Sequence, residues 1–187
     1  MKADDVVELY TLLLEHGVQI WIDGGWGIDA LLQEQTRPHK DLDAFVAFED
    51  LPTLTAVLSQ HEFSLKEIWS ENHWRQHNEH VPLIGRDDHP GEVATAFVLK
   101  DPLGRELDIH VMYVDEDGFG TPAWDCSVMF SPDALQGRGV IAGLPVRCLS
   151  AAMHMRTHTG YELQDKDKQD LRRLQERSGL DYPEKLG

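Results

Sequence analysis

One run of residues predicts a strand with two aspartates on the same face. From Lys40 to Val46, polar and apolar residues alternate before an apolar stretch, as in a strand that emerges from a loop. Residues two apart on a strand point to one side, so Asp41 and Asp43 would converge while Leu42 enters the core. Two carboxylates that close repel each other unless a cation neutralises them. Mg²⁺ fits, because one or two carboxylates and substrate phosphates together suffice to hold it.

A third candidate carboxylate lies in a predicted hairpin. The run Arg105–Val111 alternates cleanly and follows the turn-forming segment Asp101–Gly104, which comes after the apolar run Val93–Leu99. Asp108 and His110 would share one face, and a neighbouring strand could bring Asp108 beside the first pair. Three carboxylates around two metal ions could stabilise an attacking oxygen and a departing pyrophosphate, and one could take a proton from the attacking hydroxyl.

Glycines follow another predicted strand. Gly24 and Gly25 come after the apolar run Val18–Ile22 and before a helical pattern from Ile28 to Gln33. Glycines at such a junction let backbone N–H groups approach phosphate oxygens at the positive end of a helix. Glycine pairs at turns more often serve backbone geometry alone, so the order and spacing of the three pieces carry the specificity.

With these pieces placed, the chain resembles the antibiotic nucleotidyltransferases of the DNA polymerase β-like superfamily, in particular the small lincosamide and aminoglycoside-2″ adenylyltransferases. The similarity extends from about residue 18 to 175. The matching stretches are Trp21–Ala30, Thr36–Asp43, Glu106–His110, Gly139–Cys148 and Gly160–Asp167.

The resemblance implies an α+β fold of the polymerase β-like nucleotidyltransferase type, with a mixed sheet flanked by helices and a small C-terminal helical region. Residues 1–118 would form the catalytic domain, and residues 119–187 a mostly helical region that completes the active site. The implied reaction transfers AMP from ATP, bound with magnesium, to a hydroxyl of a small-molecule antibiotic and releases pyrophosphate.

The resemblance also assigns roles to individual residues. Asp41 and Asp43 are similar to the metal ligands of the family, and Asp108 to its general base with a share in metal binding. Gly24 and Gly25 would meet the triphosphate. Three cationic or ionisable side chains would neutralise it: Arg37, His39 and Lys166.

His110 stands where lincosamide-type members carry histidine and aminoglycoside-modifying members carry a carboxylate, which favours a lincosamide-like acceptor. Two features depart from the family pattern: Ala44 follows the second aspartate, and the segment 69–92 is long and rich in histidine. Trp124, like Trp69 and Trp74, would line a drug pocket or pack in the core.

Composition limits the partners. The chain has 17 Lys and Arg against 33 Asp and Glu in 187 residues, a formal net charge of −16, which disfavours nucleic acid. No window approaches the ~18 consecutive apolar residues of a membrane span, and no secretory signal begins the chain. We therefore expect a cytoplasmic protein without a membrane partner. A homodimer is possible, but no surface stripe in the sequence indicates one.

Other interpretations remain open. A nucleotidyltransferase of the same fold could modify a protein or RNA, and a non-catalytic relative could bind the nucleotide without transfer. The histidine pairs His73/His77 and His154/His158 have i, i+4 spacing but no third ligand at motif spacing, so we do not predict zinc. Cys126 and Cys148 are isolated, which indicates packing rather than a disulfide.

Periodicity predicts four further elements. They are amphipathic helices over Asp4–Glu15 and Leu51–Leu58, a helix capped by Ser150 that runs toward Thr159, and a charged helix from about Asp165 to Arg177. A turn-rich stretch over Asp115–Pro132 would separate the sheet-centred half from the C-terminal helices.

Overall fold

The chain folds around one mixed β-sheet. A computed structural model describes residues 1–71, 94–125, 127–158 and 163–180. The strand order is β3-β4-β5-β2-β1-β8-β7, and β6 pairs with β5 outside this path. The strands are β1 Ile20–Ile22, β2 Leu42–Ala47, β3 Ser64–Glu71, β4 Ala94–Lys100, β5 Glu106–Val114, β6 Gly120–Pro122, β7 Gly137–Ile141 and β8 Leu144–Cys148.

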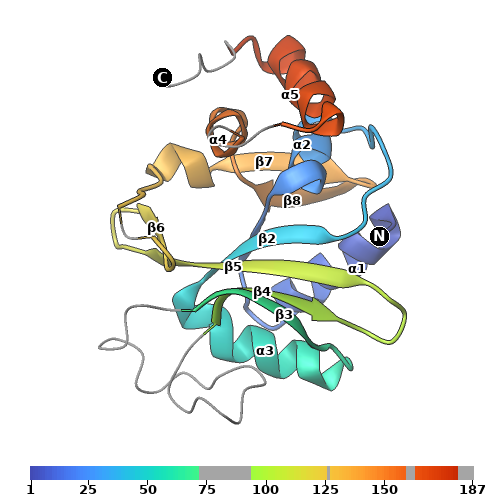
Figure 1. Cartoon of the computed structure of the whole chain (residues 1–187), viewed down its shortest axis with the longest axis vertical. Coiled ribbons are helices and arrows are strands. Elements are labelled where there is room, and N and C mark those ends of the chain that lie inside the picture. Colours follow the sequence, from blue (N-terminus) through green and yellow to red (C-terminus); the bar gives the residue numbers. More distant parts are fainter. Residues whose placement is uncertain (72–93, 126, 159–162, 181–187) are drawn as a thin grey trace.

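Helices lie toward both ends of the sheet. They are α1 Ala3–Glu15, α2 Gly24–Leu32, α3 Leu51–Gln60, α4 Ala151–Thr157 and α5 Asp165–Ser178, with short 3₁₀ turns η1 Phe48–Asp50 and η3 Pro132–Leu135. Figure 1 shows α4 and α5 toward the β7–β8 end, and α3 toward the β3–β4 end. This arrangement confirms the predicted α+β class of a mixed sheet flanked by helices.

The predicted hairpin is confirmed as β4 and β5. These strands pair antiparallel, with Val98 opposite Asp108. Leu107 and Ile109 are fully buried, whereas Asp108 and His110 are partly exposed on the other face, as the alternation predicted. Strand β2 then joins the opposite side of β5 in parallel. This parallel pairing brings the two predicted aspartate-bearing strands together at the centre of the sheet.

The predicted amphipathic helices are also present. Helix α1 buries Val6, Leu9 and Leu13 in a core that spans α1, α2, α3 and the central strands. Helix α3 carries Pro52 in its first turn, where the missing proline N–H costs no helical hydrogen bond. Leu54 and Leu58, four residues apart, enter the same core.

The C-terminal residues contribute strands as well as helices. Strands β7 and β8 form an antiparallel hairpin that joins the main sheet through β8 and β1, and β6 extends it through β5. Helix α4 begins after Ser150, whose side chain accepts a hydrogen bond from the Met153 N–H at 3.4 Å. The division at residue 118 therefore falls between two paired strands, and it stays a prediction.

Within the described residues, no helix is both long and apolar enough to span a membrane.

Candidate active site

Three aspartates stand side by side across three neighbouring strands. Asp43 on β2 is the register partner of Asp108 on β5. On the other side, the antiparallel register of β1 and β2 ends at Ile22 opposite Ala44, and the N–H of Asp23 then donates to the carbonyl of Asp43 at 2.9 Å. Since paired residues of adjacent strands share a face, Asp23, Asp43 and Asp108 form one carboxylate row.

The centre of this row has the donors of a metal site. Ligand atoms of Asp43, Asp108 and His110 all lie within 4.8 Å of one another. His110 Nε2 is 3.6 Å from Asp108 Oδ1, and that oxygen is buried without a hydrogen-bond partner among the described residues. An unpaired buried carboxylate oxygen is unfavourable, so a cation bound here would compensate it.

Asp41 lies one residue before β2 rather than within it, which differs from the predicted strand start. Its charge nevertheless raises the pKa of both Asp43 and Asp108, so its carboxylate stands near the row. Two of the three predicted carboxylates, Asp43 and Asp108, thus lie in the row with Asp23, and the charge of Asp41 acts on both of them.

Asp43 and Asp108 both have raised pKa values. Burial raises the pKa of Asp43 to about 8, helped by the charges of Asp41, Asp23 and Asp108, while the Lys166 ammonium opposes the shift. Burial also raises the pKa of Asp108, against the effect of the neighbouring His110. Like charges so close favour either a shared proton or a bound cation. Carboxylate oxygens are the donors that Mg²⁺ prefers, and the residues therefore fit this ion.

Gly24 and Gly25 form the first turn of α2, which begins four residues before the predicted Ile28. Gly24 has φ +57°, and a Cβ there would overlap the Asp43 carboxylate. A Cβ at Gly25 would overlap the His39 ring and the Arg37 guanidinium. Glycine is thus required at both positions, because the neighbouring side chains leave no room for a Cβ. Contact with a triphosphate stays a prediction for both.

Two predicted phosphate-binding residues have partners within the protein. Arg37 donates from Nε and Nη2 to Asp170 Oδ2 on α5, at 2.9 and 2.7 Å. His39 is buried, with Nε2 2.5 Å from Asp29 Oδ2 and its ring against Trp26. These contacts fix the 33–41 loop against α2 and α5. Lys166 lies at the exposed start of α5. Nucleotide binding by Arg37, His39 and Lys166 stays a prediction.

Sequence reasoning missed Asp23 and His154. His154 on α4 is fully buried, and its Nδ1 lies 3.2 Å from Asp23 Oδ1. The pKa of Asp23 is lowered despite its burial, because His154, the Gly24 N–H and His110 favour the ionised carboxylate. A signal existed, since Asp23 directly follows the β1 strand and extends its register toward Asp43.

A cluster of aromatic side chains, Phe45, His110 and Trp124, borders the carboxylate row on β2 and β5. Phe45 is the register partner of His110, and the Trp124 ring lies 5.4 Å from His110 and 5.9 Å from Phe45 between centroids. Trp69 on β3 is 58 % exposed, and its side chain lowers the pKa of Asp108 through a hydrogen bond. Trp74 and the pair His73/His77 lie outside the described residues.

Comparison with known proteins now decides the family. A family model for aminoglycoside-2″-adenylyltransferase matches residues 5–94 and 91–174, most of the chain. The chain belongs to the aminoglycoside-2″-adenylyltransferase family. It is therefore a nucleotidyltransferase of the antibiotic-resistance type, as the sequence resemblance predicted.

Relatives agree with this family assignment. A lincosamide resistance protein of Staphylococcus haemolyticus is 28 % identical over 181 residues, which cover 93 % of this chain and 98 % of that protein. The crystal structure of the lincosamide antibiotic adenylyltransferase LnuA with lincomycin has a TM-score of 0.72 at 22 % identity, covering 92 % of this chain and 95 % of that one. At this identity the structural likeness shows the shared fold alone.

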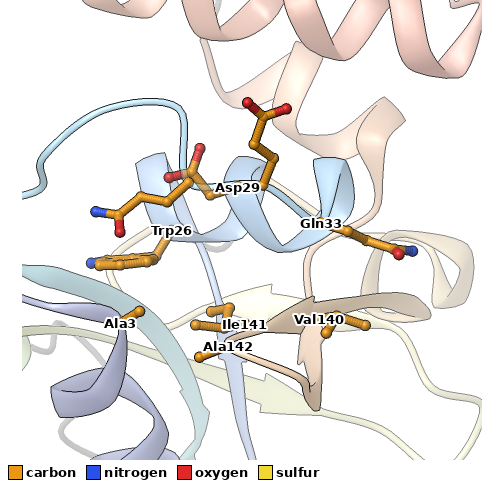
Figure 2. A pocket seen from close by; sticks show the side chains of 9 residues that line it. Ala3, Trp26, Asp29, Gln33, Val140, Ile141 and Ala142 are labelled. Atoms are coloured by element: carbon orange, nitrogen blue, oxygen red, sulfur yellow. The ribbon is translucent and has the colours of Figure 1, made fainter.

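A second structure shares the fold. ANT(2″)-Ia in complex with adenylyl-2″-tobramycin has a TM-score of 0.69 at 20 % identity, covering 95 % of this chain and 89 % of that one. The small cavity in Figure 2 is lined by none of the residues of the carboxylate row. It lies between α2 and the β7–β8 turn, beside Trp26, Gln33 and Ile141, and its volume of about 50 Å³ is far below the ~300 Å³ at which ligand pockets begin.

Proposed function

We propose that the protein transfers AMP from ATP to a hydroxyl of a small-molecule antibiotic, with magnesium, and releases pyrophosphate. A lincosamide-like acceptor is favoured, and an aminoglycoside is the second candidate. The observation that carries the proposal is the pairing of Asp43 with Asp108 in one partly buried row, with the charge of Asp41 acting on both. Two Mg²⁺ ions, when bound, would neutralise the triphosphate and the carboxylates together.

Asp108 has the properties of a general base. Its raised pKa gives the carboxylate more affinity for a proton than an exposed aspartate has, and its Oδ1 lacks a hydrogen-bond partner among the described residues. In the proposed step, the acceptor oxygen forms a bond to the α-phosphorus as the bond to pyrophosphate breaks. The hydroxyl proton goes to Asp108.

The other residues of the proposal bind and orient. Asp41 and Asp43 would hold the metal, and the N–H groups of Gly24 and Gly25 would meet phosphate oxygens at the start of α2. Lys166 already acts on Asp43 electrostatically, which supports a role for its ammonium near the triphosphate. Arg37 would have to share its guanidinium with Asp170 to do the same.

The acceptor would lie against the aromatic cluster of Phe45, His110 and Trp124. His110 and Trp124 are each partly exposed next to Asp108 and Phe45, so a ring of the drug could stack there within reach of the base. The preference for a lincosamide rests on His110 and on the similarity to a lincosamide resistance protein. We place the reaction in the cytoplasm, where ATP is abundant, and leave a homodimer as a possibility for the active unit.

The test is incubation with ATP, magnesium and a panel of lincosamides and aminoglycosides, followed by mass spectrometry. We expect one lincosamide to gain the mass of one AMP, with release of one pyrophosphate. Omission of magnesium and the variant Asp108→Asn are the negative controls. If no drug is modified while a protein or RNA acquires AMP, the macromolecule-modifying alternative is correct.

A further inference from the structure

The start of α2 has an unusual feature that involves its N-cap residue. Aspartate at an N-cap normally accepts a hydrogen bond from the second or third N–H of the helix. Asp23 occupies that position in extended conformation, yet its side chain makes no capping hydrogen bond. The N–H groups of Gly25 and Trp26 are thus left without this side-chain acceptor.

His154 explains where the carboxylate goes instead. Its Nδ1 lies 3.2 Å from Asp23 Oδ1, and the ring is fully buried. Neither ring nitrogen has a well-aligned hydrogen-bond partner among the described residues, so the ring has no other strong polar contact there. The imidazole is therefore placed to attract the carboxylate away from the helix.

Gly27 makes this placement possible. It lies one turn into α2, and a Cβ at Gly27 would overlap the His154 ring. Helix α4 can therefore bring the imidazole against α2 and up to Asp23. The absence of a side chain at Gly27 and the polar ring on α4 form one local arrangement.

We propose that His154 is a positioning residue that keeps Asp23 from capping α2, so that the N–H groups of Gly25 and Trp26 stay available to the triphosphate. The inference rests on the proposed function, because it needs a nucleotide at the start of α2. Without His154, Asp23 would rotate onto the N–H groups of Gly25 and Trp26. The capping carboxylate would then compete with phosphate for the same donors and repel it.

The experiment measures binding of a non-transferable ATP analogue with magnesium by calorimetry. We expect His154→Leu, which removes the polar contact at similar size, to weaken binding about five- to tenfold, the effect of one cap interaction. His154→Asn can place an amide N–H near the position of Nδ1 and should bind within about twofold of wild type. At saturating ATP, kcat of His154→Leu should fall by less than about threefold, so that the defect lies in KM.

The double variant Asp23→Ala/His154→Leu separates this role from a packing effect. With the competing carboxylate gone, it should recover the affinity that His154→Leu lost. Met155→Leu is the matched control, because Met155 is buried on the same helix and packs against Ile28, Leu171 and Leu174 rather than Asp23. Thermal melts confirm that each variant is folded.

Two results would overturn the inference: wild-type affinity in His154→Leu, or a double variant as weak as His154→Leu. Transfer of AMP by the wild-type protein tests the proposed function separately. If the wild type transfers AMP and either result is found, only the role of His154 is wrong. If the wild type neither binds the analogue nor transfers AMP, both proposals fall.

Discussion

Asp43 lies directly opposite Asp108 in the parallel register of β2 and β5. These residues are 65 positions apart in the chain, so their meeting is a property of the sheet rather than of either strand alone. Burial raises the pKa of both carboxylates, and the charge of Asp108 raises the pKa of Asp43 further.

Asp108→Asn should reduce kcat by about 10²- to 10⁴-fold, since a carboxamide cannot accept the hydroxyl proton. The fold should persist, because asparagine has nearly the same shape. Steady-state rates of pyrophosphate release, with circular dichroism as the folding check, measure both effects. Asp125→Asn, at an exposed loop position, is the control. A fully active Asp108→Asn would remove the base assignment.

Asp41→Ala should weaken binding of Mg²⁺ and ATP while leaving stability within about 0.5 kcal/mol, because the residue precedes β2 and is only partly buried. Calorimetric titration with magnesium and the ATP analogue gives the affinity. Lys40→Ala is a useful comparison on the same loop. Unchanged affinity in Asp41→Ala would exclude it as a ligand.

The raised pKa of Asp43 predicts a pH dependence with a definite sign. The folded protein holds this proton up to about pH 8, whereas the unfolded chain releases it near 3.8, so the folded state binds more protons in this interval. Stability without metal should therefore fall as pH rises from about 4 to 8. Asp43→Asn should remove this component, raising the melting temperature more at pH 8 than at pH 5.

Bound magnesium should reverse the fall in stability with rising pH. The ion favours ionised Asp43, so it should raise the melting temperature of the wild type most at high pH, and that of Asp43→Asn little. For a domain of this size, about 1 kcal/mol corresponds to roughly 2–4 °C. Differential scanning calorimetry at both pH values, with magnesium or with a chelator, measures the effect. An equal magnesium response in the two proteins would contradict the assignment of Asp43.

Much of the fold follows from local sequence patterns. The β4–β5 hairpin, α1, α3 and α5 are each specified by alternation or helical periodicity within one segment. The β7–β8 hairpin was not predicted, because β7 contains two glycines, β8 contains a proline, and the chain turns between them through Ala142 and Gly143, both with positive φ. Its place beside β1 depends on long-range pairing, which no local pattern contains.

The candidate site likewise combines residues that local patterns identify with residues that only tertiary packing brings together. Asp41, Asp43 and Asp108 were recognisable because their alternation and their family resemblance agreed. Asp23 was missed because its position depends on the register between β1 and β2, and His154 because only tertiary packing brings α4 to α2. The partners of Arg37 and His39, namely Asp170 and Asp29, likewise follow from packing of the 33–41 loop.

Trp124→Ala should raise KM for the drug by about tenfold or more and leave KM for ATP nearly unchanged. The indole packs against His110 and Phe45 beside the row, where the drug is proposed to bind, whereas the nucleotide is proposed to bind at the start of α2. Initial rates with each substrate varied in turn separate the two constants. The phenylalanine substitution at the same position should retain most of the drug affinity. A larger effect on ATP than on the drug would place the acceptor elsewhere.

Glu106 tests whether charges outside the site stabilise the sheet. Lys66, Lys40 and Lys100 all reach its carboxylate, at 2.9, 3.0 and 3.1 Å, and together they lower its pKa to about 2. Glu106 is only 5 % exposed, but the side chains of Lys40 and Lys100 are 72 % and 44 % exposed, so solvent screens the interactions and we expect Glu106→Gln to cost only about 1 kcal/mol at pH 7.

Because the folded-state pKa of Glu106 is lowered from 4.5, its contribution is complete above about pH 4.5 and disappears as the pH falls through 2. The stability difference between wild type and Glu106→Gln should shrink in that interval, and also in 1 M salt at pH 7. Urea denaturation at pH 7 and pH 3 measures it, with the exposed Glu176→Gln on α5 as control. Strand β5 carries both Glu106 and Asp108, so a loss of activity in Glu106→Gln without a loss of stability would mean that the lysine cluster also acts on the site.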